Sequence, residues 1–269
     1  PFPIADQAEA VTSVVEAITD RSALLLIDHV TSATGLRLPI EEIIAAIDPA
    51  VPVLVDGAHA PGMVEVDIAS LGAAFYTANC HKWLCAPKGA AFLWVAESHR
   101  GSTMPAAISH GYNDGWPGSG SRFHAQFDWT GTDDPTARLC VATALAVLAE
   151  HHPDGWPAIR ASNHELVLAG RIIVAEALGS PLPAPDSMIG SIASLSVPPQ
   201  SEPQASIFDP LTEALHARWA IEVPVFAWPA SPERLLRISA QQYNELSHYE
   251  ALADALGAEL GLASGPVRS

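Results

Sequence analysis

The feature that most constrains the fold is a series of short, almost wholly apolar runs in the first half of the chain. These runs are "SALLLI" (22–27), "VPVLV" (51–55), "AAFYTA" (73–78) and "GAAFLWV" (89–95). Stretches with helical spacing precede or separate them, at 6–19, 39–47 and 67–72. Apolar strands that alternate with helices are typical of a parallel or mixed sheet with helices on both faces. The pattern predicts an α/β fold with a mostly parallel sheet.

The second half of the chain predicts a smaller unit. Two long helices are expected at 135–151 and 156–178, followed by the proline-rich break "GSPLPAPDS". Strands at 191–197, 221–227 and 234–239 and helices at 204–218 and 245–258 then complete an α/β arrangement. We therefore expect a large domain over 1–155, a connecting helix over 156–180 and a small domain over 181–269.

Charge and composition disfavour several classes of partner. The chain has 269 residues and a net charge of −17, with 30 acidic against 13 basic side chains, so binding to a nucleic-acid backbone is disfavoured. No apolar run reaches the roughly 18 residues that a membrane span needs, and the start "PFPIADQAEA" lacks the features of a secretory signal. Three cysteines without framework spacing favour a reducing, cytoplasmic location.

Chemically useful side chains gather where the predicted strands end. Asp28 and His29 follow the first run, Asp56 follows the second with His59 three residues on, and the third leads into "NCHK" with Lys82. In open α/β sheets, ligands bind at the carboxyl ends of the strands. Taken singly, such an Asp is most often a turn residue and a Lys a surface cation. Together they predict one crevice lined with carboxylates, histidines and an amine.

Lys82 lies among apolar neighbours in "HKWLCAPKGAAFLWV", in a chain with few lysines. Burial disfavours the ammonium form and lowers the pKa of a lysine, which can then attack a carbonyl and form a Schiff base. A carboxylate such as Asp56 on a neighbouring strand can hold a protonated pyridine nitrogen. An imine-forming lysine and a carboxylate on the ring nitrogen are what pyridoxal phosphate chemistry requires.

Five motifs carry a family resemblance, and they follow one another in the family's order. They are "DHVTSATG" (28–35), "VLVDGAHAPG" (53–62), "NCHKWLCAPKGAAFLWV" (79–95), "WTGTDDPTA" (129–137) and "LRISAQQYN" (236–244). They resemble the class V aminotransferase group of fold-type I pyridoxal phosphate enzymes, and within it the isopenicillin N epimerase-like branch. That branch also contains cysteine desulfhydrase-like and ergothioneine-pathway carbon–sulfur lyases. The resemblance implies the fold predicted above, with part of the large domain absent before Pro1.

The resemblance assigns cofactor roles to residues of this sequence. Lys82 corresponds to the Schiff-base lysine, which also moves the α-proton, and Asp56 to the partner of the pyridinium nitrogen. His59 corresponds to the residue on the O3′ side of the ring, and Thr31 or its neighbour Ser32 to a polar residue near the same oxygen.

Further correspondences concern the phosphate, the substrate and a second subunit. Asn79 and His81 stand where the family places phosphate ligands. Gly131 and Thr132 resemble a loop that reaches the cofactor phosphate of the other subunit, which implies a homodimer with shared active sites. Arg237 resembles the small-domain arginine that binds the substrate α-carboxylate, for which a guanidinium fork is suited.

The sequence leaves the reaction open. The implied substrate is a small amino acid or a short peptide with a free α-amino group. Epimerisation through a Schiff base of Lys82 needs a second base, for which His110, Tyr112 and His124 are the candidates. Elimination at Cβ, as in a carbon–sulfur lyase, needs only Lys82 and a leaving group, whereas transamination needs a second substrate. A truncated, non-catalytic homologue that acts as a scaffold is the remaining alternative.

The cysteines give little support to a metal site. Cys80, His81 and Cys85 form one cluster, but a zinc knuckle normally needs four ligands in paired spacings. We expect Cys80 and Cys85 to be small buried residues and no metal to be bound. Cys140 is expected on the apolar face of a helix, which disfavours a persulfide-forming desulfurase with a mobile nucleophilic cysteine.

Overall fold

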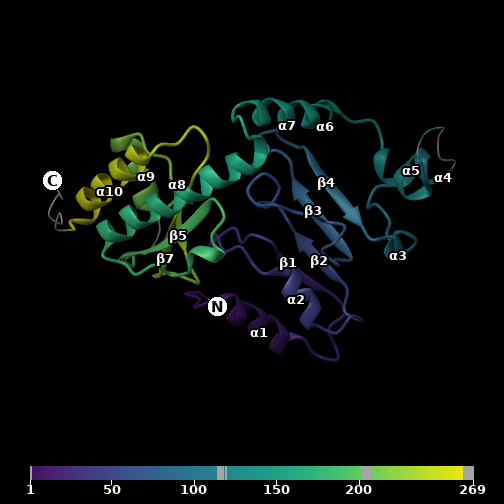
Figure 1. Cartoon of the computed structure of the whole chain (residues 1–269), viewed down its shortest axis with the longest axis horizontal. Helices are drawn as coiled ribbons and strands as arrows, with labels where there is room; N and C mark the ends of the chain where they lie inside the picture. The colour runs from purple at the N-terminus through teal and green to yellow at the C-terminus, as the bar shows by residue number, and fades with distance from the viewer. Residues whose placement is uncertain (1, 114–117, 119, 201–206, 263–269) are drawn as a thin grey trace.

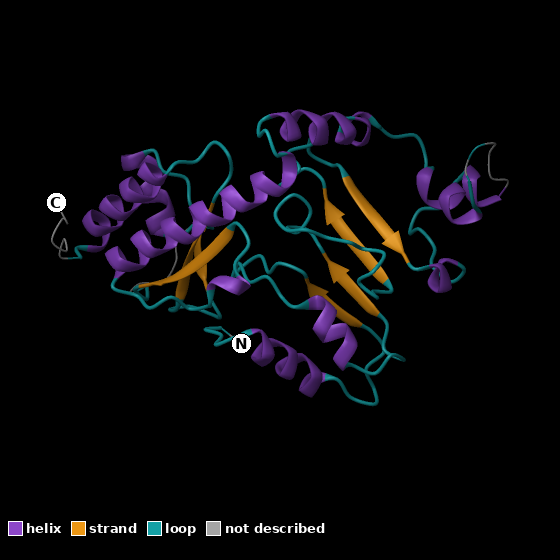
Figure 2. Ribbon diagram, in the orientation of Figure 1, coloured by secondary structure: helices purple, strands orange, loops and turns teal. Residues whose placement is uncertain are grey.

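The computed structural model describes residues 2–113, 118, 120–200 and 207–262, and contains two sheets (Figures 1 and 2). The larger sheet has the order β1-β2-β3-β4 and the smaller has the order β5-β7-β6. Their strands are β1 (Leu25–Asp28), β2 (Val53–Asp56), β3 (Phe75–Asn79), β4 (Ala91–Val95), β5 (Ile192–Val197), β6 (Val225–Ala227) and β7 (Arg234–Ser239). The predicted α/β class is confirmed, while the predicted domain boundaries remain a prediction.

The larger sheet is parallel except at one edge. Strands β1, β2 and β3 pair in parallel, and β4 pairs antiparallel with β3. Helices α1 (Gln7–Ala17) and α2 (Ile40–Ala46) pack on one face, where Ile27, Val55 and Tyr76 are buried. The opposite face carries every second residue, and Leu26 is 65% exposed there. Because side chains alternate along a strand, Asp28 and Asp56 lie on this opposite face.

The smaller sheet is covered by long helices. Helix α8 (Gly155–Leu178) packs against β5 and α10 (Leu246–Leu260), and α9 (Pro210–Trp219) packs beside α10. Their apolar side chains form one core with the strands, which includes Leu195, Leu215, Leu236 and Leu256. The 3-10 helix η1 (Asp186–Met188) follows α8 and precedes β5. The small α/β unit that the sequence predicts is therefore present.

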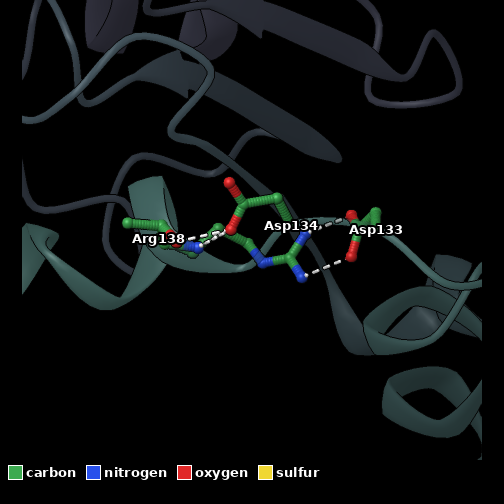
Figure 3. A network of polar contacts seen from close by, with 4 residues as sticks. Asp133, Asp134 and Arg138 are labelled. Carbon is green, nitrogen blue, oxygen red and sulfur yellow. Dashed lines mark hydrogen bonds and ion pairs between the residues drawn. The ribbon is translucent and has the colours of Figure 1, made fainter.

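A group of short helices lies beyond β4, away from the smaller sheet (Figure 1). These helices are α3 (Glu97–Arg100), α4 (His110–Asn113) and α5 (Arg122–Asp128). The chain then returns through α6 (Thr136–Leu139) and α7 (Val141–Glu150) to α8. At the start of α6, Arg138 donates two hydrogen bonds to Asp133, at 2.8 and 3.0 Å (Figure 3).

Four predicted elements differ in the structure. The expected helix at 67–72 is a turn, because the Asp67 carboxylate accepts the amide N–H groups of Ala69 and Ser70. The expected helix at 135–151 is divided at Cys140 into α6 and α7. The expected strand at 221–227 forms a ladder only over β6, and the expected helix at 204–218 begins at Pro210, after residues that partly lie outside the described ranges.

No helix in the described residues combines the length and apolar character needed to cross a bilayer.

Candidate active site

Two carboxylates stand side by side at the carboxyl end of the large sheet. Asp28 and Asp56 are register partners on the parallel strands β1 and β2, and their side chains share a face. The Asp56 carboxylate accepts the amide N–H of Ala58 at 2.8 Å, which fixes its orientation. Burial raises the pKa of Asp28, and the nearby charge of Asp56 raises it further. This edge of the sheet is therefore suited to a cation.

Lys82 lies in the turn between β3 and β4 and is half-buried. Its Nζ atom is 3.3 Å from Nε2 of His59. Burial lowers the pKa of Lys82; Asp56 opposes this shift, Arg237 adds to it, and Asp28 opposes it. A lysine held in this way has a larger fraction of the neutral, nucleophilic amine.

His59 joins Lys82 to an aromatic side chain. The indole N–H of Trp83 donates to Nδ1 of His59 at 3.3 Å. Burial, together with the charges of Lys82 and Arg237, lowers the pKa of His59 to about 4. His59 is consequently a neutral imidazole at physiological pH, with both ring nitrogens occupied by neighbours.

Arg237 reaches the site from the smaller sheet. It lies on β7, and its Nη1 atom donates to the Ser32 carbonyl at 2.6 Å and to the Ser32 hydroxyl at 3.2 Å. Its Nε atom is buried and has no partner within the described residues. Burial lowers the pKa of this guanidinium, although it remains charged at neutral pH.

A cavity of about 230 Å³ lies between these groups, and we call it the Lys82 pocket. The residues that matter for its chemistry are His59, Lys82, Trp83, Cys85, Arg237 and Gln241. The structure thus brings together three predicted site residues, His59, Lys82 and Arg237, with Asp56 acting on Lys82 through its charge.

The structure separates the two alternatives at 31 and 32. The Thr31 hydroxyl bonds Thr34 at 2.6 Å and accepts the amide N–H of Leu36 at 2.8 Å, so it closes its own turn. Ser32 instead contacts Arg237. Of the two, Ser32 is the residue that approaches the Lys82 pocket.

The two predicted phosphate ligands flank the pocket without lining it. Asn79 ends β3, and Nδ1 of His81 lies 3.1 Å from the carbonyl of Ala90. Since a carbonyl only accepts, Nδ1 of His81 carries the proton and Nε2 remains for another partner. Their role toward a phosphate remains a prediction.

The structure does not bring the remaining predicted residues to this pocket within one chain. Thr132 is exposed, and Gly131 adopts a φ of 133°, which favours glycine. Helices α4 and α5, which carry His110, Tyr112 and His124, lie at the end of the molecule away from the smaller sheet (Figure 1). Residues 114–117 and 119, which separate α4 from α5 in the sequence, lie outside the described residues.

Sequence reasoning gave no role to Gln241, which lines the Lys82 pocket, and did not predict that Trp83 donates a hydrogen bond to His59. Both residues stand in motifs that the resemblance singled out, at Lys82 and in "SAQQYN". His29 follows Asp28 but points to the opposite face, where its Nδ1 atom is 3.0 Å from the Tyr76 hydroxyl. Hence His29 supports the sheet and does not enter the pocket.

The cysteines are distributed differently from expectation. Cys80 is buried in a small apolar cluster, as predicted. Cys85 is exposed, with a left-handed φ of 54°, so its predicted burial is wrong; the turn after Lys82 directs it toward the pocket. Cys140 is half-buried at the junction of α6 and α7. Among the described residues, no group of three or more His, Cys, Asp or Glu is placed to hold a metal ion.

Comparison with known proteins identifies the family. The model of the class V aminotransferase family matches residues 3–163, which include the strand ends, Lys82 and α6. The chain belongs to the class V aminotransferase family. This membership confirms the resemblance on which the expected enzyme class and its cofactor, pyridoxal phosphate, depend.

Three relatives illustrate the match. The chain is 33% identical to isopenicillin N epimerase from Streptomyces clavuligerus, over 95% of this chain and 65% of that protein. It is 31% identical to a probable chloroplastic L-cysteine desulfhydrase from Arabidopsis thaliana, over 88% of this chain and 50% of that protein. A cysteine desulfurase from Thermococcus onnurineus has the same fold, with a TM-score of 0.71 at 20% identity, over 95% of this chain and 63% of that one. The chain thus spans half to two thirds of the length of these relatives.

The residues that line the Lys82 pocket, together with the carboxylates at the adjoining strand ends, fit pyridoxal phosphate. The fit rests on the donor set: an amine with a lowered pKa, a carboxylate pair on the adjoining strands and a guanidinium whose buried Nε atom lacks a partner. These groups match an aldehyde, a pyridinium nitrogen and a substrate carboxylate respectively.

Proposed function

We propose that this protein is a pyridoxal phosphate-dependent enzyme that acts at the α- or β-carbon of an amino acid or a short peptide with a free α-amino group. The observation that carries the proposal is the Lys82 amine, 3.3 Å from a neutral His59 and between Asp56 and Arg237. When bound, the cofactor supplies an electron sink for the substrate α-carbon.

The residues of the chain then have distinct tasks. Lys82 would provide the amine that holds the cofactor aldehyde, and the same amine would serve as the base for the α-proton at Cα. Asp56 holds the protonated ring nitrogen, with its carboxylate fixed by the Ala58 amide. Arg237 binds the substrate α-carboxylate and so orients Cα toward Nζ. Trp83 and Leu84, both buried, limit the access of water.

The first candidate reaction is epimerisation at Cα. Its support is the 33% identity to isopenicillin N epimerase over 95% of the chain. Epimerisation needs a second proton carrier on the face opposite Lys82. Since His110, Tyr112 and His124 lie outside the pocket of their own chain, this reaction requires the shared active site of the proposed homodimer, in which Gly131 and Thr132 also reach the partner's phosphate.

The second candidate is elimination at Cβ of cysteine or a cysteine S-conjugate. Two observations support it. A single chain supplies the amine base, Lys82, in the pocket, and the sequence is similar to that of cysteine desulfhydrases. A β-elimination needs only this base and a leaving group such as a thiolate.

Product analysis separates the two reactions. The protein is incubated with pyridoxal phosphate and L-cysteine, cysteine S-conjugates or sulfoxides, or α-aminoadipyl peptides. Release of pyruvate identifies a lyase, whereas loss of optical activity without pyruvate identifies an epimerase. A protein that stays colourless with added pyridoxal phosphate and turns over no substrate would instead be a scaffold.

The same proposal includes a location in a reducing compartment such as the cytoplasm. Cys80, Cys85 and Cys140 are all free thiols, which supports it.

A further inference from the structure

We propose that Trp83 is a positioning residue: its indole N–H fixes the tautomer of His59, and His59 in turn holds the Lys82 amine in its unprotonated form. The inference rests on the proposed function only in treating Lys82 as the amine that forms the imine. Its geometry is a chain of two contacts, from Trp83 Nε1 to His59 Nδ1 and from His59 Nε2 to Lys82 Nζ, each at 3.3 Å.

The first step follows from what each group is able to donate. An indole N–H is only a donor, so Nδ1 of His59 accepts and carries no proton. A neutral imidazole has one protonated nitrogen, which must then be Nε2. His59 is neutral because its pKa is lowered to about 4, chiefly by burial.

The second step concerns the partner of Nε2. An Nε2–H group that faces Nζ of Lys82 needs a lone pair on the amine. An ammonium has no lone pair, so protonation of Lys82 would require Nε2 to accept and Nδ1 to carry the proton. Nδ1–H would then face the indole N–H of Trp83, donor against donor. Protonation of Lys82 therefore costs the hydrogen bond between Trp83 and His59.

Other charged groups act on Lys82 in opposite directions. Asp56 on β2 and Asp28 on β1 favour the ammonium, while Arg237 on β7 and burial disfavour it. The tautomer of His59 acts in the same direction as Arg237 and burial, because it also disfavours the ammonium. It is a local device by which an amine beside two carboxylates remains unprotonated.

Packing holds Trp83 in place for this role. Its side chain is 8% exposed and packs with Ala60, Met63 and Ile192. A Cβ atom on Gly62, whose φ is 89°, would lie 2.9 Å from the Trp83 carbonyl, so the two backbones are in close contact. The indole is thus a fixed donor and not a mobile surface ring.

The main test measures the pKa of Lys82 in the chain without cofactor. The rate at which an amine-reactive reagent labels Lys82, followed by peptide mass spectrometry, is recorded against pH for the native chain and for Trp83→Phe. Loss of one hydrogen bond should raise the pKa by about 0.5–1 unit. Trp94→Phe removes a partly buried indole on the face of the larger sheet that α1 and α2 cover, and it should leave the pKa of Lys82 unchanged. An unchanged pKa in Trp83→Phe would overturn the inference.

A double-mutant cycle shows whether Trp83 acts through His59. In a His59→Ala background, Trp83→Phe should have no further effect on the pKa of Lys82. An equal shift of the Lys82 pKa in both backgrounds would mean that Trp83 acts by packing and not through His59, which contradicts the inference.

A measurement on the native chain avoids any folding defect of the variants. The ¹⁵N chemical shifts of His59, assigned by comparison with His59→Gln, distinguish protonated from unprotonated ring nitrogens. We expect protonated Nε2 and unprotonated Nδ1, and the opposite pattern would refute the inference. Lys82 could fail to bind pyridoxal phosphate while the pKa of Lys82 and the chemical shifts of His59 behave as expected. In that case the proposed function fails, and the role of Trp83 toward His59 and Lys82 stands.

Discussion

Two histidines of this chain, His29 buried and His59 half-buried, are neutral and have different surroundings. His59 lies in the Lys82 pocket, whereas His29 lies behind the sheet with the Tyr76 hydroxyl. Burial is the main cause in both cases, and it lowers each pKa to about 4. For His29, 3% exposed, this value affects stability and not chemistry.

His29→Gln should flatten the dependence of stability on pH. Between pH 6.5 and about 4, the unfolded chain takes up a proton at His29 that the folded chain does not. The free energy of unfolding therefore decreases as the pH is lowered through this range. A shift of this size corresponds to about 3 kcal/mol, fully lost below pH 4. Urea unfolding across this range measures it. Exposed His151→Gln is the control, and equal flattening in both variants would contradict the prediction.

At the residue scale, the sequence predicted which groups gather around Lys82 but not the contacts that they make. Lys82, Asp56 and Arg237 follow from strand ends and from the resemblance. The donor role of Trp83 did not follow, because the direction of an indole N–H depends on packing against residues distant in sequence. The same applies to Thr31 and Ser32, which only the position of Arg237 distinguishes.

At the scale of elements, helix α8 packs closely on helix α10. Gly170 on α8 allows this approach, since a Cβ atom there would lie 2.6 Å from Cγ of Tyr249. Tyr249 in turn donates its hydroxyl to the carbonyl of Ser239, the last residue of β7, which also carries Arg237. The contact therefore helps to place the strand that carries Arg237.

Gly170→Ala should destabilise the protein by about 1–3 kcal/mol, because the added methyl group overpacks the helix contact. Gly257→Ala on α10 meets no atom within 4 Å and should stabilise it slightly, by about 0.5–1 kcal/mol. Thermal or urea unfolding of the two variants gives the comparison. Equal effects would show that Gly170 is not a packing constraint.

Elements were predictable where one local signal dominated. The apolar runs marked all four strands of the larger sheet, and β7 was predicted at its observed bounds. The expected helix at 67–72 is wrong because the Asp67 carboxylate stabilises a turn by accepting a backbone hydrogen bond, whereas a helix of six residues is only marginally stable. The division at Cys140 leaves no clear mark in composition, since alanine and aliphatic residues occur on both sides of it.

At the scale of the whole molecule, the site joins the two sheets. Lys82 and Asp56 come from the larger sheet and Arg237 from the smaller one. Arg237→Gln should raise the KM for an amino-acid substrate roughly 10- to 100-fold, as expected for the loss of a charge-assisted hydrogen bond. Steady-state kinetics measure it, with exposed Arg218→Gln as the control. An unchanged KM would remove Arg237 from substrate binding.

The proposed homodimer is tested by sedimentation equilibrium. We expect twice the 28.3 kDa mass of the chain, since Gly131 and Thr132 lie away from the Lys82 pocket of their own chain. A monomer that retains activity would contradict shared active sites.

The central claim is that Lys82 forms the imine with pyridoxal phosphate, and the chain has only one other lysine, the exposed Lys88. The most direct measurement is borohydride reduction of the protein with pyridoxal phosphate, followed by peptide mapping. We expect the phosphopyridoxyl group on Lys82, retained in Lys88→Ala and lost in Lys82→Ala. Modification of Lys88 alone, or of neither lysine, would contradict the account.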